Sequence, residues 1–204
     1  MAAFVSGFSG LAVRAHTSRA SCAAVRMAAS PMSKSVPFLK KPTQLDGWAG
    51  SAEFDPIGIS EYVDIRYLRE SELKHGRICM LAAVGLIVQE LVTFGGKYFP
   101  KMLPVQAHDF YLKTGGMSQL LLFIAAFESL SYFAIRETLE GKREPGDFGF
   151  DPLNLGKEPA AFAKFRESEL KNGRLAMIAV GGMIHQQWVS GQGTLEQLFH
   201  FKPL

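Results

Sequence analysis

The sequence predicts an all-α membrane protein with three transmembrane helices. Two of these are long, crossed and related by a pseudo-two-fold axis, the third packs beside them, and a short amphipathic helix follows near the C-terminus. The chain has 204 residues, of which 48% are hydrophobic, a high share for a soluble domain of that size. The apolar residues gather in three stretches, each close to the roughly 20 residues that cross a bilayer: 78–94, 117–135 and 175–189.

An internal repeat relates the first stretch to the third. Shifting the chain by 97 positions places Arg69–Lys74 over the identical Arg166–Lys171, and Gly76-Arg77 over Gly173-Arg174. The match continues to Gln89 over Gln186. An even number of membrane crossings separates the two copies, so both run in the same direction. A two-fold axis along the membrane normal can therefore relate them, which predicts a crossed helix pair.

The remaining segments are defined by composition. Residues 1–27 are rich in Arg, Ser and Ala and contain no Asp or Glu, as in an organelle transit peptide, although a disordered tail would have a similar composition. Residues 28–66 form an N-terminal arm, which we expect to be extended from Ser30 to Gln44. The helical domain covers 67–200, with helices at about 67–93, 117–139 and 163–190 and a surface helix at Thr194–Phe199.

Several classes of protein are excluded. The net charge of +3 is scattered, without the basic cluster that nucleic acid requires. Cys22 lies in the expected transit peptide and Cys79 in a helix, so we expect no disulfide and no cysteine metal cluster. The sequence contains no constellation of a nucleophile and a base and no phosphate-binding loop, so it gives no indication of an enzyme. A transporter is disfavoured because no predicted span is broken by proline.

Charged residues within the predicted spans need partners, because an unpaired charge in a membrane is costly. On a helix, Arg77 lies about 140° from Glu72, too far around to neutralise it. If the helices cross, Arg77 can reach Glu169 and Arg174 can reach Glu72, which leaves carboxylate oxygen free on each helix. The simplest alternative is that these pairs only clamp the helices together.

Each glutamate is followed three residues later by a further potential metal ligand. His75 offers an imidazole nitrogen and Asn172 an amide oxygen, on the same helix faces as Glu72 and Glu169. Gln89 and Gln186 offer amide oxygens at the far ends. Carboxylate and amide oxygens suit magnesium, so the pattern favours magnesium ligation over simple clamping.

The motifs Glu-Ser-Glu-Leu-Lys-His-Gly-Arg (70–77) and Glu-Ser-Glu-Leu-Lys-Asn-Gly-Arg-Leu-Ala-Met (167–177) resemble those of the light-harvesting chlorophyll a/b/c-binding protein superfamily. The segments Ser33–Leu39 and Arg143–Leu153 resemble its red-lineage, red-algal type photosystem I antenna branch. The resemblance implies that chlorophyll magnesium is ligated by Glu72, His75, Glu169, Asn172 and Gln186, with Arg77 and Arg174 as crossed ion-pair partners.

The resemblance also implies further sites. On the middle helix it implies Gln119 and Glu128 as ligands; Glu128 has no evident basic partner, and a protonated carboxyl is the alternative. The turns containing Asp55-Pro56 and Asp151-Pro152 would hold carotenoid ends, unless they only start helices. His185 is expected to be a packed or hydrogen-bonded histidine rather than a ligand, and a site at His200 is doubtful.

The function that the resemblance implies is light harvesting in the chloroplast thylakoid membrane, with the N-terminus and second loop in the stroma. The cofactors would be chlorophyll a and a carotenoid, zeaxanthin-like in a red alga, with chlorophyll c in a cryptophyte or diatom. The partners would be the photosystem I core, neighbouring antenna proteins and thylakoid lipids. A photoprotective, energy-dissipating member of the same superfamily is the alternative.

Overall fold

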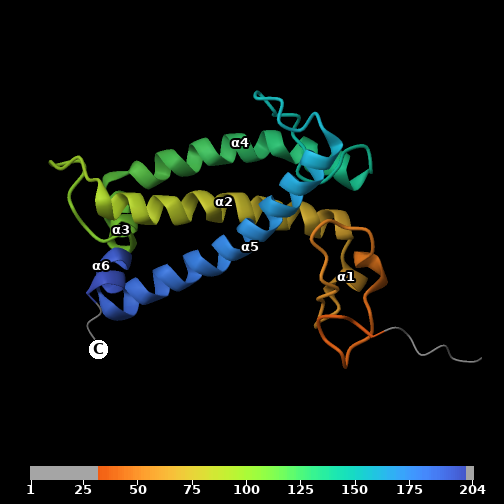
Figure 1. The fold of residues 1–204 in the computed structure, drawn as a ribbon. Coiled ribbons are helices and arrows are strands. Elements are labelled where there is room, and N and C mark those ends of the chain that lie inside the picture. The colour runs from red at the N-terminus through yellow and green to blue at the C-terminus, as the bar shows by residue number, and fades with distance from the viewer. Residues whose placement is uncertain (1–31, 201–204) are drawn as a thin grey trace, which may run out of the picture. The chain divides into compact units, whose positions relative to one another are not determined.

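The computed structural model describes residues 32–200, and in this part of the chain helices account for all regular structure apart from one isolated bridge between Met32 and Lys40. The three long helices are α2 (Ile65–Leu91), α4 (Gly116–Leu139) and α5 (Pro159–Ser190), drawn in Figure 1. The predicted all-α class is confirmed for these residues. The expected transit peptide, with Cys22, lies outside them.

Helices α2 and α5 are the crossed pair. Asp64 caps the start of α2 by accepting a hydrogen bond from the N–H of Arg66, and Pro159 occupies the first turn of α5, where its missing N–H costs nothing. Gly191 ends α5 with a positive φ of 64°. The helices have 27 and 32 residues, so they extend roughly 40 Å or more, beyond the ~30 Å of a bilayer core.

The crossing point consists of two glycines. A Cβ atom on Gly76 would lie 3.1 Å from the Cα of Gly173, and one on Gly173 would lie 3.1 Å from the Cα of Gly76. Leu73 and Leu170, one turn before each glycine, are buried beside them. Close approach of the backbones is therefore possible only because both positions lack a side chain.

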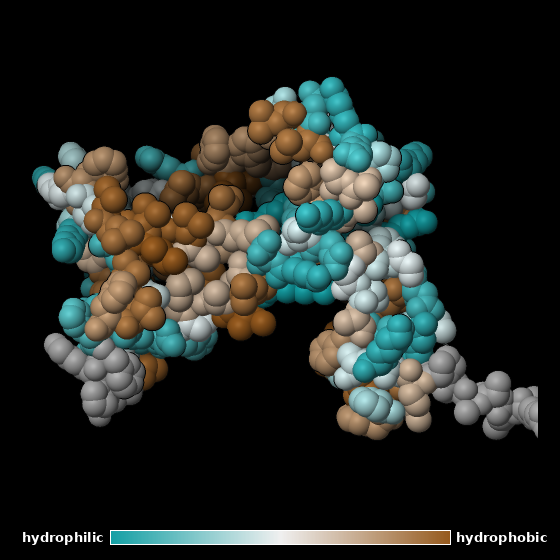
Figure 2. All heavy atoms as spheres, in the orientation of Figure 1, coloured by the Kyte–Doolittle hydropathy of each residue, from teal (hydrophilic) through white to brown (hydrophobic). Residues whose placement is uncertain are grey.

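Helix α4 packs against α2 and has the composition of a membrane span. It is the one helix in residues 32–200 that is both long and apolar enough to cross a bilayer by length and composition. Helices α2 and α5 are long enough but carry most of their charges in their first halves, with Glu90 in the last turn of α2 as the exception. Large apolar side chains remain exposed along all three helices, and Figure 2 shows hydrophobic surface over their middle and hydrophilic surface around the crossing.

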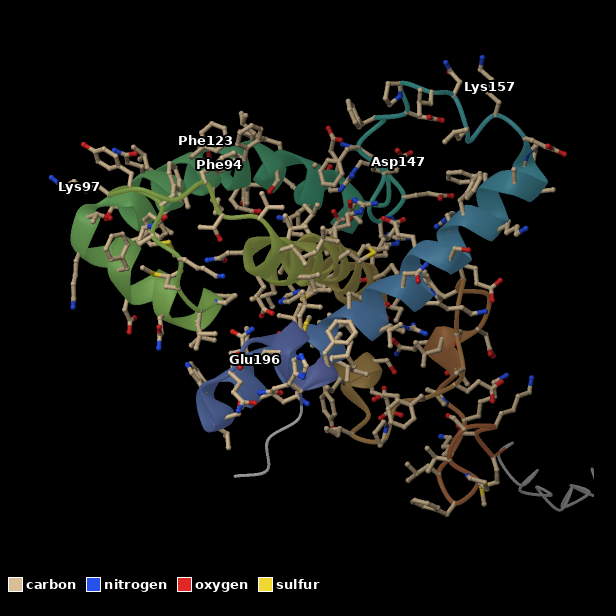
Figure 3. All side chains as sticks on the ribbon, turned by 60° about the vertical axis from the view of Figure 1, so that its left-hand side comes forward. Phe94, Lys97, Phe123, Asp147, Lys157 and Glu196 are labelled. Carbon is tan, nitrogen blue, oxygen red and sulfur yellow. The ribbon has the colours of Figure 1, made fainter. Side chains whose placement is uncertain are left out.

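One end of the helices is closed by short elements. Helix α6 (Thr194–Phe199) matches the predicted surface helix, whereas the segment 95–116, between the first two predicted helices, contains helix α3 (Pro104–Thr114). Proline in its first turn and Gly115 at its end, with φ of 82°, supply the start and stop that the expectation overlooked. Lys97 and Glu196 lie at this end, and Asp147 and Lys157 at the other (Figure 3).

The N-terminal arm is more folded than expected. From residue 32 it turns back on itself: the N–H of Ser33 donates to the carbonyl of Leu39, and the Ser33 hydroxyl donates to the carbonyl of Glu53 at 2.5 Å. Two short helices follow, η1 (Thr43–Leu45) and α1 (Ile59–Tyr62). The extended arm predicted for Ser30 to Gln44 is therefore wrong where the structure describes it, because buried Ser33 provides local hydrogen bonds.

Candidate functional site

Two ion pairs connect α2 and α5 at their crossing. Arg77 Nε donates to Glu169 Oε1 at 2.6 Å, and Arg174 Nε donates to Glu72 Oε1 at 2.7 Å. These are the pairings that the two-fold axis predicts. The four side chains are about one-quarter to two-fifths exposed, so charge neutralisation here matters more than it would at a fully wet surface.

Each of these arginines is also held by a backbone carbonyl from the loop that precedes the opposite helix. Arg77 Nη2 donates to the carbonyl of Gly146 at 2.9 Å, and Arg174 Nη1 donates to that of Gly50 at 2.8 Å. Both glycines have positive φ, 79° and 64°. The pseudo-two-fold relation therefore includes the two loops as well as the helices.

The side chains of His75 and Asn172 are oriented in the same way, each against the backbone carbonyl four residues earlier. His75 Nδ1 lies 2.8 Å from the carbonyl oxygen of Ser71, and Asn172 Nδ2 donates to that of Ser168 at 2.9 Å. A carbonyl only accepts, so the hydrogen of His75 is on Nδ1 and the lone pair on Nε2 points outward. Asn172 Oδ1 is likewise left to accept. Both residues are exposed and present a neutral ligand atom away from the helix.

The two glutamates differ in one respect. Glu72 Oε2 accepts a second charged hydrogen bond, from Arg69 Nη1 at 2.7 Å. The repeat-matched Arg166 turns instead to Glu144, at 2.7 Å, so Glu169 Oε2 has no hydrogen bond from the residues that the structure describes. A carboxylate oxygen has two lone pairs, so both glutamates can still ligate a metal. Glu169 offers the less hindered oxygen.

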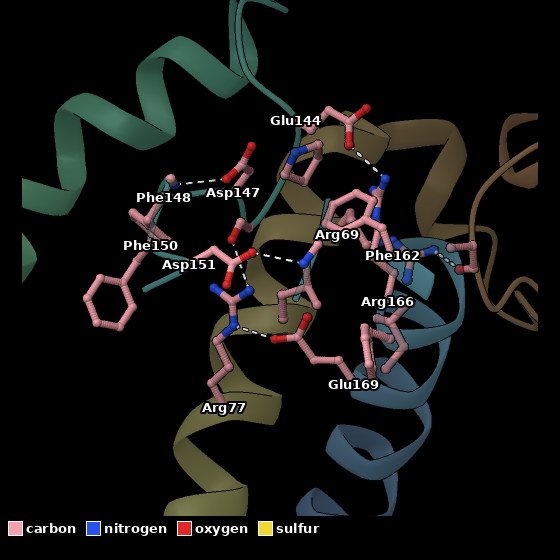
Figure 4. Close-up of a pocket in the computed structure, with 18 of the residues that line it drawn as sticks. Arg69, Arg77, Glu144, Asp147, Phe148, Phe150, Asp151, Phe162, Arg166 and Glu169 are labelled. Atoms are coloured by element: carbon pink, nitrogen blue, oxygen red, sulfur yellow. Dashed lines mark hydrogen bonds and ion pairs between the residues drawn. The ribbon is translucent and has the colours of Figure 1, made fainter. Parts of the chain in front are cut away.

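A cavity of about 780 Å³ opens beside Glu169, on the side of the loop 140–158 (Figure 4). Its lining combines the ion pair of Arg77 and Glu169 with aromatic rings from Phe148, Phe150 and Phe162. A volume of this size holds a medium-sized organic ligand, and an apolar wall with a few polar groups is typical of a cofactor site. Of the candidate ligands at the crossing, Glu169 lines this cavity, whereas Glu72, His75 and Asn172 do not.

The Asp55 and Asp151 turns form the same type of structure. Asp151 accepts hydrogen bonds from the N–H groups of Gly156 and Leu155, at 2.9 and 3.1 Å, and these lower the pKa of Asp151 below its ordinary value. Partial burial raises the pKa of Asp55, but hydrogen bonds from the Ser60 hydroxyl and from backbone N–H groups outweigh it, so the net change is downward. Pro56 and Pro152 follow the two carboxylates directly.

The candidate ligand Glu128 on α4 has a basic partner in the structure. Glu128, for which the sequence offered no basic partner, accepts a hydrogen bond from Lys74 Nζ of α2 at 2.5 Å, and Ser131 lies 3.1 Å from the same oxygen. The expectation of an unpaired carboxylate is therefore wrong, because the partner comes from a neighbouring helix. Gln119, Gln89 and Gln186 are not brought into the crossing, and their side-chain amides make no hydrogen bond within residues 32–200.

Two residues important to this framework, Glu70 and Glu90, were not singled out by sequence reasoning. Glu70, only 4% exposed, accepts hydrogen bonds from Arg143 at 3.0 Å and from the N–H of Gly146 at 2.6 Å, which fixes the loop that holds Arg77. Glu90 accepts from the N–H groups of Thr194 and Leu195, at 2.6 and 2.8 Å, and so holds α6. A signal was available only for Glu70, which lies inside the repeated motif.

Comparison with known proteins gives the family. The family model for chlorophyll A-B binding proteins matches residues 41–188. A fucoxanthin-chlorophyll a-c binding protein of Isochrysis galbana is 36% identical over 156 residues, 68% of this chain and 73% of that protein. Chlorophyll a-b binding protein 6 of Arabidopsis thaliana is 32% identical over 192 residues, 85% and 75% of the two chains. The light-harvesting complex stress-related protein 1 of Chlamydomonas reinhardtii is 35% identical over 164 residues, 71% and 64%.

The chain therefore belongs to the chlorophyll a/b-binding protein family, and the resemblance of the two repeated motifs to the light-harvesting chlorophyll-binding superfamily is confirmed. Members of this family are light-harvesting proteins, which also confirms that the chain is not an enzyme. The matched segment contains both ion pairs and the cavity.

Proposed function

We propose that the protein is a light-harvesting antenna that binds chlorophyll and carotenoid in the thylakoid membrane and passes excitation energy to a photosystem. The observation that carries this proposal is the matched pair of outward ligand atoms, His75 Nε2 and Asn172 Oδ1, three residues after two charge-paired glutamates. A clamp between helices would need the ion pairs but would not need these two residues turned outward.

The role of the protein is to fix geometry. Bound chlorophyll would supply the light absorption, and its magnesium would take a ligand from the protein. Glu72, His75, Glu169 and Asn172 would provide such ligands near the crossing, where the glycine contact and the ion pairs hold α2 and α5 rigid. Gln89, Gln186, Gln119 and Glu128 would provide ligands further out.

The orientation follows from charge and from the placement of the loops. Helices α2, α4 and α5 would all cross the membrane, with the more basic segment 136–166 and the N-terminal arm in the stroma. Helix α6 and the segment 95–116 would lie in the lumen. In this arrangement the turns at Asp55-Pro56 and Asp151-Pro152 hold the stromal ends of two carotenoids, and residues 1–27 act as a plastid transit peptide.

The partner would be photosystem I, through its core and neighbouring antenna proteins, with thylakoid lipids covering the exposed apolar side chains. Chlorophyll a with a zeaxanthin-like carotenoid is the pigment set of the red-algal branch that the Ser33–Leu39 and Arg143–Leu153 motifs resemble. Chlorophyll c would be added in a cryptophyte or diatom.

Pigment analysis of the native protein tests this function. We expect several chlorophylls and at least one carotenoid per chain, and co-purification with photosystem I after mild solubilisation. Replacing His75 or Asn172 by Leu in a reconstituted protein should each remove one chlorophyll, whereas Lys171→Leu, on an exposed part of the same motif, should remove none. A native protein without chlorophyll would contradict the proposal.

The similarity to a stress-related relative supports a second candidate, photoprotective dissipation of excitation energy. A dissipating protein needs groups at the lumenal end that change charge when the lumen acidifies. The described residues there include His108, Asp109 and Glu196. The fluorescence lifetime of the purified protein decides between the two: an antenna keeps the same lifetime at pH 7.5 and pH 5, and a dissipating protein shows a shorter one at pH 5.

A further inference from the structure

We propose that His185 is an additional chlorophyll ligand, on a face of α5 to which none of the sites above belongs. This inference rests on the proposed pigment-binding function. The sequence led us to expect a packed or hydrogen-bonded histidine rather than a ligand; in the structure the side chain is exposed and hydrogen-bonded through Nδ1, and the ligand role now falls to Nε2.

The argument begins with the orientation of the ring. His185 Nδ1 lies 2.7 Å from the carbonyl oxygen of Gly181, four residues earlier on α5. The hydrogen must therefore be on Nδ1, and the lone pair of Nε2 points away from the helix. This is the arrangement of His75 with Ser71 and of Asn172 with Ser168. Nδ1–H donation to a carbonyl is also the usual second contact of metal-bound histidines.

The internal repeat shows that His185 is a departure from the common pattern. The matching position on α2 is Val88, and the position matching Gly181 is Val84, both with exposed apolar side chains. In α5 a histidine and a glycine stand one turn apart where α2 has two valines. The helix folds with either pair, so neither the imidazole nor the missing side chain is needed for the crossing.

The surroundings of the ring leave space for a flat ligand. Side chains on a helix lean toward its N-terminus, so the His185 ring covers the turn that contains Gly181 and Gly182. A Cβ atom on either glycine would have no neighbour within 4 Å. Trp188 stands edge-on to the imidazole, with the ring centres 5.6 Å apart, and is 65% exposed. An exposed patch of glycine, tryptophan and an outward nitrogen suits an apolar macrocycle with a metal at its centre.

The site is distinct from those already described. Around the helix axis His185 lies about 100° from Gln186 and about 140° from Asn172, so a ligand on Nε2 would occupy another side of α5. Ile178, 76% exposed, and Val189, 66% exposed, lie on the His185 side. No charged side chain of residues 175–190 could compete for the imidazole.

Reconstitution with purified pigments tests the assignment. The variant His185→Val restores the residue that α2 has at the matched position, and we expect it to fold and to bind one chlorophyll fewer per chain than the unaltered protein. The reverse change, Val88→His on α2, should not add a chlorophyll. On α2 the side chain of Val84 covers the turn next to the new histidine, whereas the matching residue on α5, Gly181, has no side chain. A His185→Val protein with the full chlorophyll complement would overturn the proposal.

A second variant keeps the test decisive if His185→Val does not assemble. His185→Gln replaces the imidazole nitrogen by an amide oxygen, as at Gln186, so the chlorophyll count should be retained while one absorption band shifts. An unchanged absorption spectrum with an unchanged count would overturn the proposal. If the unaltered protein binds no chlorophyll at all, the antenna function itself fails, which is a separate outcome from these.

Discussion

Replacing Gly76 by Ala tests the helix crossing most directly. The added Cβ would lie 3.1 Å from the Cα of Gly173, whereas carbon atoms in contact prefer about 3.5–4.0 Å. The neighbour is backbone on a rigid helix and cannot rotate aside. Helices α2 and α5 would therefore have to separate by roughly 0.5 Å at this point.

The separation has a calculable effect on the ion pairs. The Arg77–Glu169 and Arg174–Glu72 distances are now 2.6 and 2.7 Å, and an added ~0.5 Å would take them beyond the short range of charged hydrogen bonds. Overpacking of this kind costs about 1–3 kcal/mol. Alanine gains about 0.5–1 kcal/mol over glycine from helix propensity, so the net loss in the free energy of unfolding is about 0–2.5 kcal/mol.

The matched control is Gly85→Ala on the same helix. A Cβ atom there meets nothing within 4 Å, so only the propensity gain applies, and stability should rise by about 0.5–1 kcal/mol. Unfolding of the pigment-reconstituted proteins in detergent, followed by circular dichroism of the pigments, compares the two. Equal stability of Gly76→Ala and Gly85→Ala would refute the glycine contact as the basis of the crossing.

Three further predictions concern separate parts of the framework. Glu90→Gln should loosen α6, because the charged acceptor for the N–H groups of Thr194 and Leu195 is lost. Hydrogen exchange at those two amides should accelerate by roughly tenfold or more. Unchanged exchange rates would contradict the role of Glu90 in holding α6. Lys74→Met should remove the chlorophyll that we propose for Glu128, because the carboxylate would lose its cation. Retention of every chlorophyll would count against this proposal. Asp151 should titrate below the ordinary aspartate value of about 3.9. Its stabilising effect is then fully present above that value and lost as the pH falls through the lower folded pKa, and an NMR midpoint at or above about 3.9 would contradict this.

Much of the fold was predictable because it is repeated. The matched segments from Arg69 and Arg166 give both long helices, their parallel direction and the crossed pairing of charges, since an unpaired charge in a span is too costly. Helix α6 follows from its amphipathic pattern. Helix α3 lies outside the repeat, and its start and stop signals, Pro104 and Gly115, were overlooked. The folded arm could not be found in this way, because it depends on local hydrogen bonds such as that from Ser33 to Glu53 rather than on a periodic pattern.

The site was less predictable where partners come from other elements. Lys74 and Glu128 lie on different helices, and nothing in either segment indicates the other. The contact between Glu90 of α2 and Thr194 of α6 was unpredictable for the same reason, because the two residues are 104 positions apart in the sequence. The orientation of His185 depends on a rotamer, and the sequence shows only that a histidine and a glycine replace two valines of the repeat.

The most direct test of the central claim compares the unaltered protein with the double variant Arg77→Ala, Glu169→Ala in pigment reconstitution. The double variant removes a complete ion pair and leaves no unpaired charge, so the helices can still associate through the second pair, Arg174 and Glu72. Our account predicts several chlorophylls on the unaltered chain and one fewer on the variant. An equal number on both proteins would contradict it and would show that Glu169 only clamps the helices together.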